Sequence, residues 1–343
     1  MLVGGTEEAV EVSLLETRDV VVDFPTSEGR SIRAVDHVSI SLEPGETLGI
    51  VGESGCGKST LARAILQLVR PTSGSVVLKD LELTGLKGRE LRSLRKQMQM
   101  VFQDPRGCLD PRMSVGALLT EPLRVHKLGA SGGRKHRAQE MLERIGLDSR
   151  FMSRRPADMS GGQQQRVAIG RALITNPELV ICDEPVSALD VSIQAQVINL
   201  LGELQRDLGV ALIFIAHDLA VVRHISDRVA VMYLGRIVEE GPTDELFQNP
   251  RHPYTQGLIA SIPQADSDAR IRLQNAQRLA AGDLPSLLDP PSGCAYRTRC
   301  AYVQESCSTN VPLLREVPKT AQRVACDLWE EIQANEQLDT RRH

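Results

Sequence analysis

The sequence predicts an α/β fold with a parallel-sheet core, an antiparallel β subdomain, an inserted helical subdomain and a small C-terminal module that contains cysteines. Three observations support this prediction. The compact apolar runs 179–182 and 211–216 are typical of strands that are buried on both faces of a parallel sheet. The stretch 191–208 between them has helical periodicity. Four of the seven cysteines lie within residues 294–326.

Composition excludes several classes of protein. The chain has 343 residues, enough for one large domain and a smaller one. Its 40 Lys and Arg against 44 Asp and Glu give a net charge of −4, which argues against a nucleic-acid binder with a basic surface. Aromatic residues make up 3%, so stacking on bases is not its main role. We see neither an apolar run of the ~20 residues that cross a bilayer nor a signal peptide, and expect a cytoplasmic protein.

The first part of the chain predicts the antiparallel β subdomain. Apolar runs at 20–24, 34–42 and 75–78 read as strands separated by turn-forming residues. The short apolar run 47–51 then enters a glycine-rich loop, and 60–69 has the apolar spacing of a helix. Strand, loop and helix in this order form half of a parallel βαβ unit.

The loop carries the pattern G-x-x-x-x-G-K-S. Its glycines let backbone amides converge on phosphate oxygens, Lys58 adds positive charge at the β and γ phosphates, and the hydroxyl of Ser59 ligates Mg²⁺. A glycine turn that merely precedes a helix is the alternative, which the flanking strand and helix disfavour. The residues expected to bind ATP here are Gly52, Glu53, Ser54, Gly55, Cys56, Gly57, Lys58, Ser59 and Thr60.

The middle of the chain predicts the inserted helical subdomain, at about 104–165. It mixes helical stretches such as 137–145 with expected loops such as GASGGRK. Just before it, the apolar run 98–102 ends at Gln103, whose amide oxygen can reach Mg²⁺ or a water molecule.

A second glycine pattern precedes a helix expected at 164–173. Ser160, Gly161, Gly162 and Gln163 read S-x-x-Q, which is a capping box and thus an ordinary helix start. A cap does not need two glycines, however, and bare amides at a helix N-terminus bind anions. Since a second phosphate site would serve a second nucleotide in a dimer, the pattern favours a shared site.

Two carboxylates follow the apolar run 179–182. Asp183 and Glu184 are delivered to the C-terminal end of a strand, where ligands bind in open α/β sheets. Asp183 can hold the Mg²⁺ shell, and Glu184 can polarise a water for attack on the γ-phosphate; a solvated acidic turn is the alternative. His217 ends the run 211–216 at the same edge, and a purely structural histidine is the alternative to a γ-phosphate contact.

The cysteines near the end follow the spacing C-x5-C-x6-C-x18-C. Four thiolates can hold a [4Fe–4S] cluster or a tetrahedral Zn²⁺ ion. Structural disulfides are disfavoured in a reducing compartment, and unligated cysteines are a further alternative. The spacing fits neither a zinc ribbon nor a ferredoxin. The candidate ligands are Cys294, Cys300, Cys307 and Cys326.

These motifs stand in one fixed order, together with Ser187-Ala188-Leu189-Asp190. Over about residues 12–260 the chain therefore resembles the nucleotide-binding subunit of an ATP-binding cassette (ABC) transporter. The resemblance implies an ABC-type P-loop ATPase in which two subunits sandwich two ATP molecules. It implies that residues 160–163 act in trans on the partner's ATP and that 187–190 cross the dimer interface.

Further roles come from the same resemblance. Gln103 couples the site to the membrane subunits and, with Ser59 and Asp183, binds Mg²⁺. Phe24 resembles the aromatic residue that stacks on adenine, with a buried strand residue as the alternative. Met159 stands where Leu is commoner, which is a volume-conserving exchange.

A narrower resemblance covers the second half. Residues 249–255 (NPRHPYT), 282–285 (GDLP) and 290–294 (PPSGC) are similar to the C-terminal extension of ATPases that drive dipeptide and oligopeptide import in bacteria, most closely the dipeptide-type second ATPase. This implies a [4Fe–4S] cluster on the cysteines, with Zn²⁺ as the alternative. It also implies a heterodimer with a second ABC ATPase, two permease subunits, an extracytoplasmic solute-binding protein and no nucleic acid, on the cytoplasmic face of the inner membrane.

The expected alternatives are an importer of another small solute, such as nickel or glutathione, a soluble ABC ATPase not coupled to transport, and a non-catalytic regulatory subunit. The expected divisions of the chain are an N-terminal tail (1–11), the nucleotide-binding domain (12–260), the C-terminal extension (261–330) and a polar tail (331–343).

Overall fold

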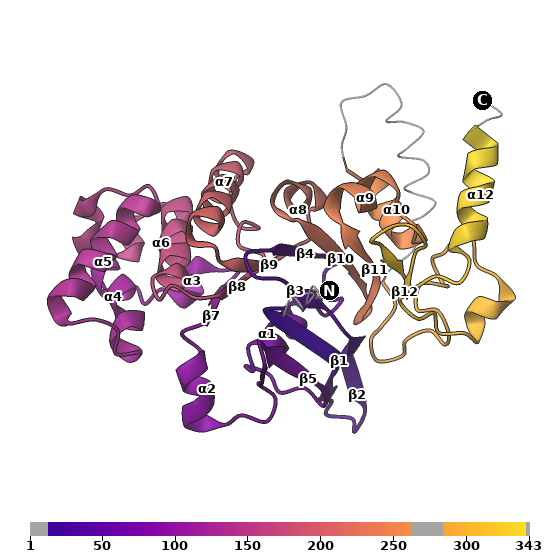
Figure 1. The fold of residues 1–343 in the computed structure, drawn as a ribbon, viewed down its shortest axis with the longest axis horizontal. Coiled ribbons are helices and arrows are strands. Elements are labelled where there is room, and N and C mark those ends of the chain that lie inside the picture. The colour runs from indigo at the N-terminus through magenta and orange to yellow at the C-terminus, as the bar shows by residue number, and fades with distance from the viewer. Residues whose placement is uncertain (1–12, 263–283, 341–343) are drawn as a thin grey trace, which may run out of the picture.

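A computed structural model describes residues 13–262 and 284–340, which form two sheets and the helices around them (Figure 1). The larger sheet has the order β12-β13-β11-β10-β4-β9-β8-β7. Strands β10, β4, β9, β8 and β7 are parallel, and β11, β13 and β12 continue the sheet in antiparallel fashion. These strands are β4 (Thr47–Val51), β7 (Met98–Val101), β8 (Leu179–Asp183), β9 (Ala211–Ala216), β10 (Arg228–Tyr233), β11 (Arg236–Pro242), β12 (Arg315–Glu316) and β13 (Arg323–Val324).

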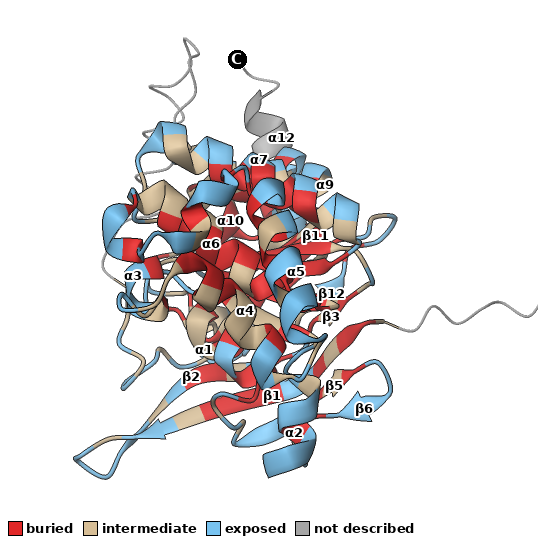
Figure 2. Cartoon of the chain, turned by 90° about the vertical axis from the view of Figure 1, so that its left-hand side faces the viewer, coloured by how far each residue is buried: buried red, intermediate tan, exposed pale blue. Residues whose placement is uncertain are grey.

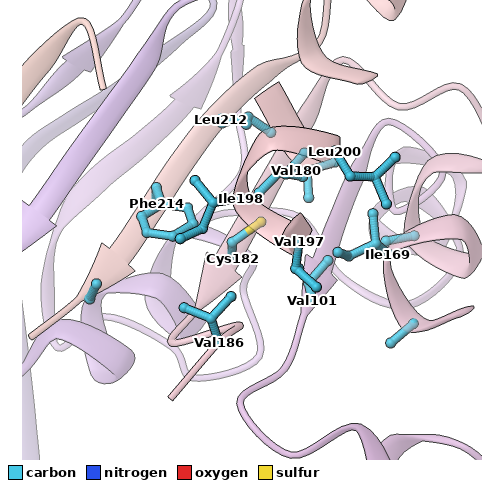
Figure 3. Close-up of a cluster of buried hydrophobic side chains, with 14 of the residues drawn as sticks. Val101, Ile169, Val180, Cys182, Val186, Val197, Ile198, Leu200, Leu212 and Phe214 are labelled. Carbon is cyan, nitrogen blue, oxygen red and sulfur yellow. The ribbon is translucent and has the colours of Figure 1, made fainter. Parts of the chain in front are cut away.

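The central strands are buried on both faces. Every residue of β4, β8 and β9 is buried, as expected for continuous apolar runs in a parallel sheet. Alternate residues enter two separate cores. Val180 and Cys182 of β8 belong to the core beneath the helices, whereas Leu179 and Ile181 belong to the core shared with the β subdomain. Figure 3 shows the first core, where Val180 and Cys182 lie near Val197. The predicted parallel core is confirmed.

The smaller sheet is antiparallel, as predicted. It consists of β1 (Leu15–Pro25), β2 (Ser31–Val38), β3 (Ser41–Leu42), β5 (Ser73–Leu78) and β6 (Leu81–Glu82). The single strand expected at 34–42 is wrong, because it divides into β2 and β3. Between them the N–H of Ile40 donates to the hydroxyl of Thr17 at 2.9 Å and so leaves the regular ladder.

The helices surround the larger sheet, and buried residues lie mainly between helices and sheet (Figure 2). The α-helices are α1 (Lys58–Ile65), α2 (Gly88–Leu94), α3 (Pro105–Cys108), α4 (Val115–Val125), α5 (Ser131–Arg144), α6 (Gly161–Leu173), α7 (Val191–Leu208), α8 (Leu219–Ile225), α9 (Thr243–Gln248), α10 (Pro253–Ala260) and α12 (Trp329–Thr340). Short 3₁₀ helices are η1 (Ser149–Ser153), η2 (Pro156–Asp158) and η3 (Glu305–Ser308).

Two helix predictions need correction. Helix α1 ends before the expected residue 69, since Gln67 adopts a left-handed φ of 53°. Helix α5 begins at Ser131, so the expected loop GASGGRK is wrong from that residue on. The N–H of Arg134 donates to the Ala130 carbonyl at 3.0 Å, which starts the helix despite its two glycines.

The helical subdomain and the C-terminal module lie at opposite ends of the long axis (Figure 1). The module is joined to the core sheet through β13, where Glu239 pairs with Val324 and Glu240 with Arg323. Helix α12 covers residues 331–340 of the expected polar tail. The structure does not describe the expected tail 1–11 or residues 263–283 of the expected C-terminal extension, which include Gly282 and Asp283 of GDLP. Within residues 13–262 and 284–340, no helix is long and apolar enough to cross a bilayer.

Candidate functional site

Ser59 and Asp183 meet where α1 begins and β8 ends. The Ser59 hydroxyl donates to Asp183 Oδ1 at 2.7 Å. Asp183 is 4% exposed, and burial raises the pKa of its carboxyl group, while the Ser59 hydrogen bond opposes that shift. Hydroxyl and carboxylate oxygens are the ligands that Mg²⁺ prefers. Two of the three side chains predicted to hold this ion therefore lie together.

Glu184 lies beside them, and two further predicted residues, Gln103 and His217, lie against its carboxylate. Its Oε2 accepts a 3.0 Å hydrogen bond from Gln103 Nε2, and His217 Nδ1 lies 3.6 Å from the same oxygen. Glu184 has a left-handed φ of 46°, a strained conformation that is typical of functional sites. The ring of His217 is well exposed, so it is not a buried structural histidine. The structure thus brings together Ser59 and the four residues predicted at the strand ends.

The phosphate loop is closed on itself. Lys58 Nζ donates to the carbonyls of Gly52 at 2.7 Å and Glu53 at 2.9 Å. Gly57, with φ 107°, precedes α1, and a Cβ there would lie 2.1 Å from the Ala34 carbonyl oxygen. Only glycine therefore fits at this position of the loop. Cys56 is fully buried, and burial raises the pKa of its thiol.

The pattern at 160–163 forms the start of α6. Ser160 Oγ accepts from the Gln163 N–H, and Gln163 Oε1 accepts from the Ser160 N–H at 3.1 Å, so the capping box is real. A Cβ at Gly162 would lie 2.5 Å from Ile193 Cγ2, which gives this glycine a packing reason within the chain. A Cβ at Gly161 would meet its nearest atom, on Leu189, at an ordinary 3.4 Å. Internal packing therefore does not explain Gly161.

Phe24 lies near the end of β1 and is 38% exposed. The alternative of a buried strand residue is therefore wrong. An exposed aromatic face is free to stack on a planar ligand.

Two residues that the sequence did not predict contact the phosphate loop. Tyr254 Oη accepts from the Glu53 N–H at 2.9 Å, and Arg299 Nη1 donates to Glu53 Oε2 at 2.9 Å. Burial raises the pKa of Tyr254, so its hydroxyl stays neutral. The available signals were weak: Tyr254 lies in the NPRHPYT segment, and Arg299 precedes Cys300. Glu53, expected to bind ATP, faces these two residues.

The four clustered cysteines line one cavity of about 30 Å³. All are free thiols. Burial raises the pKa of Cys300 to about 11 and that of Cys326 to about 12. Among the residues described, no group of three or more His, Cys, Asp or Glu side chains is arranged to hold a metal ion. This structure therefore does not support the predicted metal site on these cysteines. It does show that the four thiols line the same cavity.

Family comparisons match two parts of the chain. Residues 35–187 match the family described as ABC transporter, and residues 238–307 match the oligopeptide/dipeptide transporter C-terminal region. The second match begins in β11 and runs through the cysteine-containing stretch to Cys307.

Curated proteins align along most of the chain. It is 51% identical over 311 residues to the oligopeptide transport ATP-binding protein OppF of Salmonella typhimurium, covering 88% of this chain and 92% of that protein. It is 50% identical to OppF of Escherichia coli, with the same coverage. It is 46% identical over 328 residues to the oligopeptide transport ATP-binding protein AppF of Bacillus subtilis, covering 94% of this chain and 99% of that protein.

Solved structures agree with this alignment. The dimeric post-hydrolysis structure of the ATP-binding cassette MJ0796, bound to ADP and Pi, superposes with a TM-score of 0.62 at 32% identity, covering 67% of this chain and 98% of that one. The structure of cbiO1 from Clostridium perfringens superposes with a TM-score of 0.62 at 28% identity, covering 70% and 92%. The chain therefore belongs to the ABC transporter ATPases, in the group that carries the oligopeptide/dipeptide C-terminal region, and it hydrolyses ATP.

Proposed function

We propose that this chain hydrolyses ATP at an interface between two ABC ATPase subunits and so drives the import of small peptides. The observation that carries the proposal is the 2.7 Å contact between Ser59 and Asp183, with Glu184 beside it. The names of the curated relatives favour oligopeptides as cargo. The dipeptide type expected from the sequence belongs to the same substrate class.

The chain's own residues fit Mg-ATP. Ser59 and Asp183 would hold Mg²⁺, with the amide oxygen of Gln103 as a further ligand. Mg²⁺ in such sites takes only one or two protein carboxylates, because phosphates and waters supply most of its other ligands. When bound, it neutralises charge on the β and γ phosphates. Lys58 would exchange its bonds to the loop carbonyls for bonds to phosphate oxygens.

Glu184 is the general base in this proposal. Its carboxylate accepts the proton of the attacking water, and the Gln103 amide holds one of its oxygens in place. His217, whose Nδ1 lies 3.6 Å from Glu184 Oε2, would contact the γ-phosphate. The strained backbone of Glu184 fixes the direction of its side chain.

Residues 160–163 complete the site of a second subunit. Ser160 is exposed at the N-terminus of a 13-residue helix, where amides and the helix dipole attract phosphate. Val191, directly after the 187–190 segment, is 82% exposed, which suits a contact surface. The similar cassette MJ0796 is a dimer. The proposed partner here is a second, paralogous ABC ATPase.

The remaining parts of the assembly follow from the proposed import. Two permease subunits form the path across the inner membrane, and Gln103 couples the ATP site to them. An extracytoplasmic solute-binding protein delivers the peptide. The chain then sits peripherally on the cytoplasmic face of that membrane.

A [4Fe–4S] cluster on Cys294, Cys300, Cys307 and Cys326 is the finer part of the proposal. Its support is that all four thiols line one cavity. Zn²⁺ bound by the same four thiolates is the alternative. The metal content of the purified protein decides between the two.

The test is peptide uptake by the assembled transporter. The chain, its partner ATPase, the permeases and the binding protein are reconstituted in vesicles with ATP on the side of the ATPases. We expect ATP-dependent uptake of a labelled tripeptide and loss of both uptake and phosphate release with Glu184→Gln. The matched control is Glu203→Gln on the exposed face of α7, which should act as wild type. Uptake of nickel or glutathione in place of peptide would contradict the proposed cargo.

A further inference from the structure

Glu53 joins the phosphate loop to the C-terminal half of the chain. Its N–H donates to Tyr254 Oη at 2.9 Å, and its carboxylate accepts from Arg299 Nη1 at 2.9 Å. Its carbonyl accepts from Lys58 Nζ at 2.9 Å. Glu53 thus links the phosphate-binding Lys58 to Tyr254 and Arg299, which lie 201 and 246 positions further along the chain.

The ion pair at the centre of this link is shielded. The side chain of Arg299 is 6% exposed and that of Glu53 is 29% exposed. A charge-assisted hydrogen bond in such a place is stronger than an exposed surface pair. The guanidinium carbon also lies 5.9 Å from the ring centroids of both Tyr233 and Tyr296. These rings restrict the directions in which Arg299 can point.

The same tyrosines connect three parts of the fold. Tyr233 ends β10, Tyr254 belongs to α10, and Tyr296 lies in the cysteine-containing stretch. Their rings pack edge to face, with centroids 4.7 Å apart for Tyr233 and Tyr254 and 5.2 Å apart for Tyr233 and Tyr296. Since β10 pairs with β4, which enters the loop, the cluster holds the module against the base of the phosphate loop.

We infer that Arg299 is a positioning residue for the phosphate loop. By holding the Glu53 carboxylate it fixes the backbone of Glu53, and so sets the loop conformation that meets the nucleotide. The inference rests on the ATPase part of the proposed function and not on its cargo.

The experiment compares ATP hydrolysis by the assembled transporter carrying Arg299→Met, Glu53→Gln or both. We expect the KM for ATP to rise on the order of tenfold in each single variant, as for loss of a charge-assisted hydrogen bond. The kcat should change less, because neither residue touches the reacting atoms. The double variant should be no worse than either single one, since both remove the same interaction.

Two further variants separate positioning from folding. Arg299→Lys keeps the positive charge and should restore part of the lost affinity. Arg297→Met changes a neighbouring arginine that bonds to Ser292 inside the module, and it should leave the KM unchanged. Wild-type KM values in Arg299→Met and Glu53→Gln, or additive effects in the double variant, would overturn the inference. If Arg299→Met does not fold, Glu53→Gln and Arg299→Lys decide the question by the same KM criterion.

The cargo is tested separately from this role. If the transporter fails to import peptides but the KM shift is present, the proposed cargo is wrong and the positioning role stands. If uptake of peptides is normal but the KM for ATP does not change in the variants, the proposed cargo stands and the positioning role of Arg299 is wrong.

Discussion

The hydroxyl of Ser59 donates a 2.7 Å hydrogen bond to Asp183, 124 residues further along the chain. The bond joins the phosphate loop to the strand that carries the acidic pair. It also brings two of the three proposed protein ligands of Mg²⁺ into contact.

Removal of the Ser59 hydroxyl should weaken magnesium use. For Ser59→Ala we expect phosphate release to fall by about 10²-fold at physiological Mg²⁺, the size typical for loss of one preorganised electrostatic group. Raising the Mg²⁺ concentration should recover part of the loss. The control is Ser93→Ala, because the Ser93 hydroxyl bonds to Glu90 within α2. Equal Mg²⁺ dependence in Ser59→Ala and wild type would remove Ser59 from the ligand set.

Replacement of Ser160 separates its two roles. Asn caps helices as well as Ser does, whereas Ala costs about 1 kcal/mol. We therefore expect Ser160→Asn to keep the melting temperature of wild type and Ser160→Ala to lower it. Both should at least halve ATP hydrolysis by the assembled complex, since one of its two sites depends on this helix start. Full hydrolysis by Ser160→Asn would show that Ser160 is only a cap.

The cysteine module should carry a chromophore. Protein purified without oxygen should be brown and absorb broadly near about 400 nm, as Cys-ligated iron does. The colour should disappear in Cys300→Ser and persist in Cys108→Ser, which changes a cysteine outside the cavity. Colourless wild-type protein with one zinc per chain would contradict the cluster.

Stability should depend on pH through Glu239. This residue is fully buried, and burial raises the pKa of its carboxyl group to about 7 from an ordinary 4.5. Between about pH 4.5 and about pH 7 Glu239 therefore keeps its proton in the folded state and loses it in the unfolded state. The free energy of unfolding accordingly falls as pH rises over this range. The melting temperature of wild type should fall over this range more steeply than that of Glu239→Gln. Parallel slopes in the two proteins would contradict the assignment, and Glu203→Gln serves as the surface control.

Much of the fold was predictable because its signals are local. Strand β9 and helix α7 begin and end at the predicted residues, since a continuous apolar run and a long helical periodicity leave little choice. Residues at the ends of β7, β8 and β9 came together as predicted, because parallel strands present their C-terminal ends at one edge. The glycines at the start of α5 led to the wrong prediction of a loop, because a helix tolerates glycine at a modest cost in stability.

The rest could not be predicted because it depends on contacts without a local pattern. The two-residue strands β12 and β13 are too short to show alternation. The pair of Glu53 and Arg299 joins two charged residues that, read singly, look like ordinary surface residues. Only the folded chain shows that both serve one loop.

The pairing of β13 with β11 has a consequence for anyone who shortens this protein. Without residues 284–340, β11 would become the exposed edge strand of the sheet, with unpaired backbone groups. Glu240 would also lose its hydrogen bond with Arg323. Such a fragment would keep every ATP motif, but its exposed strand edge should pair with strands of other molecules and cause aggregation. Removal of the C-terminal residues should therefore lower the solubility of the protein.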